Sequence, residues 1–497
     1  MKKYILIIAV FFTIGISGCK KDFLSLEVNP NSPSVTTPQL TLAGALATAA
    51  ALVNTSYSQD GVWVGYWTTS GSYVPNPAVS QFQITNANFA GVWTGLYQNL
   101  TNFNNLQVAS AKDPALGNFQ AIAMIMKAYD FQQLVDQFND VPYSQAFQPS
   151  TILFPAYDKG QAIYDDLTKQ LTAAIALINK SSAGTNPGVS DIVFGGNMVG
   201  WKKFANSLLL RLAIRQSTKN QGNAAAAALA ATAGEGYLDE TTQASANPGY
   251  SNDVGKQSPF YGNYGLDPNG NPTFPNLYYR GNTFFINLLK SYNDPRLTHV
   301  YAPTSGGGII DGNVLGDVKT SKSNAATSGI GPNLLISSSQ NALIFSGAES
   351  LFLQAEALQD GYSISGAATT PATAQVAYER GITASFIALG LKASDATAYY
   401  GQAINNVGWA ASSNKKQAII YQKFISLIGY SNLEGYLEYV RTGYPVLPNP
   451  VSIDPGAVSN VIPIRQYYPL SELTSNPTQL AKEGTIDIFN SKIFWDN

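Results

Sequence analysis

The 497-residue sequence contains one cysteine, Cys19, and one histidine, His299. Structural and catalytic zinc sites draw on several cysteine or histidine ligands, so this chain cannot build one of the usual kind. Catalysis by a Ser-His-Asp triad could use only His299, and no Gly-x-Ser-x-Gly motif accompanies it. We therefore expect no metal site, no cofactor and no catalytic residues, and we interpret His299 as a packed or solvent-facing side chain.

Charged residues are also scarce, at 12% of the chain, and nearly balanced, with 29 Lys and Arg against 31 Asp and Glu. Nucleic-acid binding requires a strong positive field, so we expect no nucleic-acid partner. Apolar residues make up 45%, enough for a large core. The many Asn, Gln, Ser, Thr and Tyr side chains suit uncharged polar ligands, such as sugars or peptides, that bind through hydrogen bonds and stacking.

Only one run is strongly apolar, and it lies at the N-terminus. Lys2 and Lys3 precede the apolar residues 4–16, and small residues follow at 17–18. This pattern is typical of a signal peptide, which we place at residues 1–18. The run is shorter than the roughly 20 residues of a membrane-spanning helix, so we expect none in the mature chain.

Cys19 follows this leader directly, in the sequence Ile-Ser-Gly-Cys. The sequence resembles a bacterial lipobox, which implies that Cys19 is acylated and becomes the new N-terminus. Several acyl chains would anchor the protein firmly to a membrane. Lys20, Lys21 and Asp22 resemble the tract that sorts lipoproteins of Bacteroidetes to the outer face of the outer membrane. Residues 19–37 would then form a lipidated tether.

Helical spacing of apolar residues recurs along the mature chain. It predicts helices over residues 38–53, 89–111, 117–138, 157–179, 197–217, 223–233, 282–292, 348–360, 371–389, 395–404, 414–428 and 433–441. Residues 234–346, apart from 282–292, are rich in Gly, Pro, Asn and Ser and predict loops. Asp140 to Tyr143 read as a turn.

Several stretches together resemble the SusD/RagB family, surface lipoproteins of Bacteroidetes, and in particular its SusD-like branch. They are WKKFANSL from Trp201, NDVPYSQAF from Asn139, DPRL from Asp294, ESLFLQAEA from Glu349, EGYLEYVRTGYP from Glu434, IPIR from Ile462 with Tyr468-Pro469, and KIFWD from Lys492. The resemblance implies a mostly α fold, with a core of helix-turn-helix, tetratricopeptide-like repeats and a loop-rich, variable ligand-binding region. We expect one such domain over residues 38–497, with a loop-rich insertion at about 234–346. The resemblance also implies a SusC-like TonB-dependent transporter as partner.

Glu349 and Glu356 lie seven residues apart and so share one helix face. They could form a catalytic acid pair, because glycoside hydrolysis needs two carboxylates on either side of one bond. The favoured interpretation is that they pair with Arg211, Arg296 or Arg441 in a buried network.

Two aromatic stretches in Gly-, Ser- and Asn-rich surroundings are the candidate ligand site. Rings stack on sugar rings, and neighbouring amides and hydroxyls bond the sugar hydroxyls. The candidates are Tyr66, Trp67 and Tyr73 in the first stretch, and Tyr261, Asn263, Tyr264, Tyr278 and Tyr279 in the second. Trp93, at helical spacing from Phe89 and Tyr97, is expected in the core.

These features predict a binding protein that is lipid-anchored to the outer membrane and faces the exterior. It would capture an oligosaccharide and deliver it, uncleaved, to the transporter. The alternatives are a peptide-binding member of the same family, an acid-pair glycoside hydrolase, and a scaffold that binds neither ligand.

Overall fold

The computed structural model describes residues 36–219, 234–364 and 369–496. The predicted signal peptide, the lipidation site Cys19, most of the tether and the predicted helix 223–233 lie outside these residues. Helices dominate the described chain, and its strands are two to four residues long. The mostly α fold expected from the sequence is confirmed.

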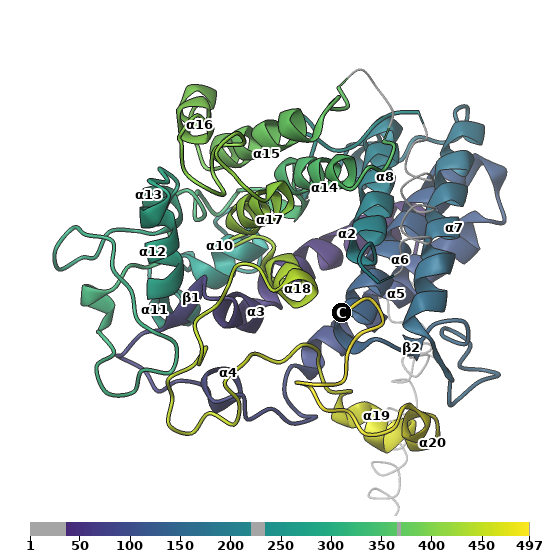
Figure 1. Cartoon of the computed structure of the whole chain (residues 1–497). Helices are drawn as coiled ribbons and strands as arrows, with labels where there is room; N and C mark the ends of the chain where they lie inside the picture. Colours follow the sequence, from purple (N-terminus) through teal and green to yellow (C-terminus); the bar gives the residue numbers. More distant parts are fainter. Residues whose placement is uncertain (1–35, 220–233, 365–368, 497) are drawn as a thin grey trace, which may run out of the picture.

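The N-terminal half builds one side of the molecule from long helices, shown in Figure 1 from purple to blue. They are α2 (Pro38–Thr55), α5 (Ala90–Ser110), α6 (Gly117–Phe138), α7 (Gly160–Lys180) and α8 (Met198–Arg215). Successive members α5, α6, α7 and α8 pack on one another, and α2 packs on α5. Short connections between neighbouring helices produce this side-by-side arrangement of hairpins.

The C-terminal half adds a second helical group, green in Figure 1, that packs on the first through α14 and α8. Its members are α14 (Gly347–Gln359), α15 (Ala374–Ala388), α16 (Ala393–Tyr400), α17 (Lys415–Ser426) and α18 (Asn432–Thr442). The tail carries α19 (Leu470–Ser475) and α20 (Pro477–Leu480) and then returns to the N-terminal helices. There Trp495 is buried, and its indole N–H donates to Asp136 at 2.8 Å.

Short elements fill the rest of the fold. The helices are α3 (Ser58–Trp63), α4 (Pro77–Ser80), α10 (Pro259–Tyr264), α11 (Phe274–Tyr278), α12 (Thr283–Ser291) and α13 (Leu297–Val300), with 3₁₀ turns η1 (Pro114–Leu116), η2 (Gly188–Ser190), η3 (Asn324–Ala326) and η4 (Ala481–Glu483). The strands pair antiparallel as β1 (Trp67–Thr69) with β5 (Tyr279–Gly281), β2 (Val141–Pro142) with β3 (Tyr157–Asp158), and β4 (Ala244–Ala246) with β6 (Ala342–Phe345).

The region after α6 differs from the sequence-based expectations in two details. Asn139 adopts a positive φ of 68° that ends α6, after which Val141 and Pro142 form strand β2 rather than a simple turn. Tyr157 and Asp158 belong to the partner strand, so α7 begins at Gly160 instead of residue 157. The predicted helix was too long because a two-residue strand has no periodicity to read.

Residues 38–63 are long and apolar enough, by length and composition alone, to cross a membrane. In the fold they form two separate helices, α2 and α3. Leu42 and Leu46 of α2 have no exposed surface, because α2 packs on α5 and β6. We therefore assign this segment to the protein core.

Two buried groups of ion pairs join five helices. The first contains Asp136, Arg211, Arg215, Glu349 and Glu434, and the second contains Glu356, Lys423, Glu438 and Arg441. Glu349 pairs with Arg211 at 2.7 Å, and Glu356 pairs with Arg441 at 2.8 Å. The prediction that both glutamates pair with buried arginines is confirmed. Arg296, the third arginine considered, pairs instead with Asp294 at 2.7 Å.

Asp130 is a second kind of buried acid, in the middle of α6. It has no exposed surface, and it accepts a hydrogen bond from the Asn99 side chain at 2.9 Å. Burial raises the pKa of Asp130 to about 8, and the bond from Asn99 opposes this only in part. An exposed aspartate titrates near pH 4. The folded chain therefore holds a proton on Asp130 between about pH 4 and pH 8, where the unfolded chain does not.

We expect Asp130 to lower the free energy of unfolding as the pH rises from about 4 to 8. The folded state binds more protons than the unfolded state in this window, so its contribution is complete below pH 4 and lost by about pH 8. Asp130→Asn should flatten the dependence, measured by urea unfolding at pH 5 and pH 8. Asp253→Asn is the control, since Ser251 and Lys256 lower the pKa of the exposed Asp253. This expectation would be contradicted if the free energy of unfolding changed equally between pH 5 and pH 8 for Asp130→Asn and the wild type.

Candidate functional site

Strand pairing brings the two predicted aromatic stretches together. In the β1–β5 ladder, Trp67 lies opposite Gly281 and Thr69 lies opposite Tyr279. The Ser70 N–H then donates to the Tyr278 carbonyl at 2.9 Å, which continues the pairing past the strand ends. Two segments far apart in the sequence therefore form one surface, at the left of Figure 1 around β1 and α11.

Three rings form what we call the aromatic patch: Tyr73, Phe274 and Tyr278. The centroid of Tyr73 lies 5.4 Å from that of Phe274 and 6.1 Å from that of Tyr278. Phe274 and Tyr278 are 5.3 Å apart. Phe274 is 60% exposed, while the two tyrosines are half-buried. The patch is thus a cluster of surface rings that contact one another, in which Tyr73 and Tyr278 are also packed partly into the protein.

Local hydrogen bonds hold these rings in place. The Asn76 N–H donates to the Tyr278 hydroxyl oxygen at 3.0 Å. The Thr273 hydroxyl donates to the Asn263 carbonyl at 2.7 Å, and the Asn276 side chain donates to the Tyr264 carbonyl at 2.7 Å. These two bonds fasten α11, which carries Phe274 and Tyr278, to α10. A preorganised surface loses little conformational freedom on binding.

The loop at residues 321–324 closes the surface beside Tyr73. The Gly71 N–H donates to the Lys322 carbonyl at 2.9 Å, and the Asn324 N–H donates to the Ser72 hydroxyl at 3.2 Å. A Cβ at Gly71 would lie 2.3 Å from the Ser321 carbonyl oxygen, so this approach requires glycine. Exposed Ser72 and Asn76 thereby lie close to the rings and provide polar groups.

Arg280 lies two residues after Tyr278, in β5. Its side chain is buried, and among the described residues it forms no ion pair and its Nε has no hydrogen-bond partner. Burial lowers the pKa of the guanidinium, while Tyr73 opposes this. Arginine nonetheless stays protonated. A charged donor without a partner therefore lies near Tyr73.

Three of the eight predicted ligand residues are core residues instead. Tyr66, Trp67 and Tyr264 are at most 5% exposed. The Tyr66 hydroxyl donates to the Phe424 carbonyl at 2.5 Å, and the Trp67 ring meets Tyr301 edge-on at 5.4 Å. A turn at Gly65, with φ of 82°, directs both residues inward. These three rings therefore cannot stack on a ligand at the surface of this fold. Trp93 is also buried, as expected.

The other three candidates flank the patch. Tyr261, Asn263 and Tyr279 are half-buried, and the Tyr279 ring lies 5.1 Å from Tyr278 and 6.0 Å from Tyr264. The crevice between Trp67, Tyr264 and Tyr279 has a volume of only about 10 Å³. It can hold little more than a water molecule, so a sugar ring would have to bind on the outer surface.

Phe274 was not among the predicted site residues, although it lies within the second aromatic stretch. Thr273 caps α11 through its hydroxyl, and Pro275 occupies the first turn. This Thr-Phe-Pro sequence is a helix-start signal that leaves the intervening ring at the helix tip. Reading that signal could have identified Phe274 as exposed.

The acids with raised pKa values do not lie at this surface. Burial raises the pKa of Asp60, Asp130, Asp136 and Glu349, and all four side chains are fully buried. Burial also raises the pKa of Glu483, which is half-buried in η4 and pairs with Lys159 at 3.1 Å. Within the described ranges, no group of three or more His, Cys, Asp or Glu side chains could hold a metal ion. His299 packs with its Nδ1 2.9 Å from the Leu389 carbonyl. The surface thus offers rings, amides, hydroxyls and one guanidinium.

Comparisons with known proteins identify the fold. The chain is similar over 93% of its length to the whole of a solved chitin-binding protein, with 27% identity and a TM-score of 0.74. It also matches a chitin-binding SusD homolog from Flavobacterium johnsoniae, with 23% identity, coverage of 92% and 98%, and a TM-score of 0.74. A SusD homolog from Bacteroides uniformis matches with 23% identity, coverage of 92% and 99%, and a TM-score of 0.72.

No curated protein sequence matches the chain. The family model SusD-like_2, described as starch-binding and associating with the outer membrane, matches residues 30–469. This range contains both helical groups and the whole aromatic patch. The chain belongs to the SusD-like family of carbohydrate-binding proteins associated with the outer membrane.

Proposed function

We propose that the chain is a surface-exposed lipoprotein of the outer membrane that binds an extracellular oligosaccharide on the aromatic patch and delivers it to a SusC-like TonB-dependent transporter. The aromatic patch is the observation that carries this proposal. Apolar ring faces remove the C–H faces of a pyranose from water, and the amides and hydroxyls beside them bond its hydroxyl groups. The chitin-binding description of the 27% identical structure supports the same class of ligand.

Each part of the surface has its own role in this proposal. Phe274 and Tyr73 stack on sugar rings, and Tyr278 supports them from the side. Arg280, which forms no ion pair with the described residues, donates to an oxygen at the ligand edge. Tyr261, Asn263 and Tyr279 extend the surface for longer ligands.

The proposed protein binds and releases its ligand unchanged. Glycoside hydrolysis needs one proton-donating acid and one carboxylate on opposite sides of the bond. Asp60, Asp130, Asp136 and Glu349, whose pKa values burial raises, have no exposed surface for a sugar to contact. Incubation with a bound oligosaccharide should release no new reducing ends, and their appearance would favour the hydrolase alternative.

Phe274→Ala should weaken oligosaccharide binding about tenfold, or about 1.4 kcal/mol. Loss of one stacking face accounts for a change of this size. The ring is exposed, so the free energy of unfolding should change little. Calorimetric titration against a glycan panel would measure the effect, and the double variant Tyr73→Ala/Phe274→Ala should bind more weakly still.

Phe154→Ala is the matched control, because Phe154 is 55% exposed in the loop between β2 and β3, away from the patch. It should bind as the wild type does. Equal binding by Phe274→Ala and Phe154→Ala would reject the patch as the site. A peptide panel titrated in parallel tests the peptide-binding alternative, which predicts retention of peptides and none of the glycans.

A further inference from the structure

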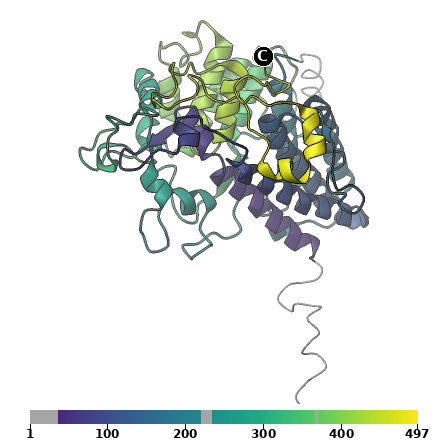
Figure 2. The same cartoon turned by 90° about the horizontal axis from the view of Figure 1, so that it is seen from below.

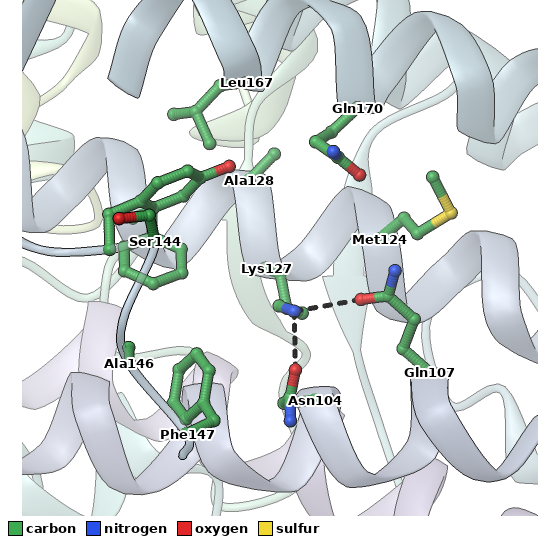
Figure 3. A pocket seen from close by; sticks show the side chains of 12 residues that line it. Asn104, Gln107, Met124, Lys127, Ala128, Ser144, Ala146, Phe147, Leu167 and Gln170 are labelled. Atoms are coloured by element: carbon green, nitrogen blue, oxygen red, sulfur yellow. Dashed lines mark hydrogen bonds between the residues drawn. The ribbon is translucent and has the colours of Figure 1, made fainter. Parts of the chain in front are cut away.

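A cavity of about 210 Å³ lies at the other side of the fold from the aromatic patch. Figure 1 places its helices, α5, α6 and α7, at the right and the β1–α11 region at the left. Residues 143–147, in the loop after β2, form one wall of the cavity, as Figure 3 shows. Ser144 in this loop is exposed, so the cavity opens to solvent.

The cavity contains a lysine without an acidic partner. The Lys127 ammonium donates to the side-chain oxygens of Asn104 at 2.8 Å and Gln107 at 2.9 Å, both drawn in Figure 3. Both acceptors are neutral, and α5, which supplies them, has no charged residue. Among the described residues no carboxylate lies within ion-pairing distance of Lys127, and one of its three N–H groups is left after these two bonds.

The surroundings make this charge unusual. Burial lowers the pKa of Lys127 to about 8, and no neighbouring acid offsets the effect. Two acids next to the cavity are bonded to its lining residues instead. Asp166 accepts hydrogen bonds from the Tyr143 hydroxyl at 2.6 Å and from Gln170 at 3.3 Å, and Asp158 accepts one from the Ser144 hydroxyl at 2.8 Å. A partly desolvated cation is stabilised when an anion reaches it, so half-buried Lys127 favours a negatively charged occupant.

Phe147 shapes the opening. Its backbone has a φ of 61°, a conformation that non-glycine residues rarely adopt and that costs roughly 1 kcal/mol or more. The Lys127 ammonium lies over the Phe147 ring, 5.4 Å from its centroid. Met124 and Leu167 provide further apolar wall. An occupant therefore needs an anionic end for Lys127 and an apolar face for these side chains.

We propose that this cavity is a second binding site, which takes a small molecule bearing a carboxylate, of the size of one sugar acid or one capped amino acid. The carboxylate accepts the remaining N–H of Lys127, and the body of the ligand packs on Phe147. A sugar acid and the C-terminal residue of a peptide both carry such a carboxylate. The site is independent of the aromatic patch and of the function proposed for it.

The test is a calorimetric titration of the protein from residue 20 onward with D-glucuronate and N-acetyl-alanine, each against a neutral analogue, glucose and N-acetyl-alanine amide. We expect the carboxylates to bind at least tenfold more tightly than their analogues. Tighter binding of glucuronate identifies a sugar acid as the source, and tighter binding of N-acetyl-alanine identifies a peptide terminus. No binding of either acid, or equal binding of acid and analogue, would overturn the proposal.

Two variants test the role of Lys127. Lys127→Met keeps the length of the side chain without its charge, and Asn104→Asp places a carboxylate next to the ammonium while retaining it. Both variants should bind the carboxylate ligands at least tenfold more weakly. If one variant fails to fold, the other still tests the role of Lys127. Lys256→Met, at an exposed lysine, is the control. Phe274→Ala should leave this binding intact, which separates this site from the patch.

The pH dependence is a further readout. Affinity for D-glucuronate should fall as the pH rises from 7 to 9, because Lys127 loses its proton in that range. Burial raises the pKa of Tyr143, so this hydroxyl keeps its proton. The assignment would be overturned if Lys127→Met and Asn104→Asp bound D-glucuronate as tightly as the wild type does. It would also be overturned if the affinity of the wild type for D-glucuronate did not depend on pH.

Discussion

Glu434→Ala should destabilise the protein by about 3–5 kcal/mol, the usual range for removing one partner of a buried ion pair. Glu434 bridges Arg211 at 3.2 Å and Arg215 at a shorter distance, and all three side chains are buried. Burial alone would raise the pKa of Glu434, but the two arginines hold it below its ordinary value. Without this carboxylate, the only remaining acidic partner of Arg215 in the described network is Asp136, at 3.7 Å.

Denaturant unfolding monitored by circular dichroism would measure this loss. Glu434→Gln keeps the shape and removes only the charge, so it should recover a small part of the stability. Asp253→Ala is the control, because Asp253 pairs with Lys256 at 3.5 Å while both side chains are about two-thirds exposed. Such surface pairs contribute about 0–1 kcal/mol. A Glu434→Ala effect as small as that of the control would show that the network adds little.

Cys19→Ala should release the protein from the outer membrane completely, since it removes the proposed acylation site. Several acyl chains, at about 0.8 kcal/mol per buried methylene, supply the whole proposed anchorage. Growth with a labelled fatty acid, followed by membrane fractionation, would measure both the modification and the location. We expect label on the wild type and none on Cys19→Ala.

Ser17→Ala is the matched control, because it keeps a small residue before the cysteine and should be acylated normally. Membrane-bound, labelled Cys19→Ala would contradict the lipoprotein assignment. Glycan binding by the Cys19→Ala protein should equal that of the wild type, since the aromatic patch lies in the folded domain. The two proposals can therefore fail separately.

Much of the helical fold could be predicted because long helices leave a repeated apolar pattern. α6 begins and ends at the predicted residues, Gly117 and Phe138, and α5 differs by one residue at each end. The short helices α10 and α11 were missed, since five or six residues hold too few turns to show a period. Their prolines, Pro259 and Pro275, were the available signal.

The candidate site was predictable as a region and not as a set of exposed side chains. Tyr66 and Tyr73 lie in the same aromatic stretch, yet one is in the core and the other is at the surface. The difference depends on the turn at Gly65 and on the pairing of β1 with a strand far along the chain. Composition does not reveal that pairing. The arginine partners of Glu349 and Glu356 could be predicted, because a carboxylate buried in a helical core requires a charged partner.

The β1–β5 ladder also joins rings that are synthesised far apart in the chain. A polypeptide exported with its N-terminus leading delivers Tyr73 well before Phe274, and the half that arrives first holds only one ring of the three. Prey outside the cell would therefore meet no competent surface on an incompletely secreted chain. The aromatic patch is therefore complete only after β1 has paired with β5, three residues against three.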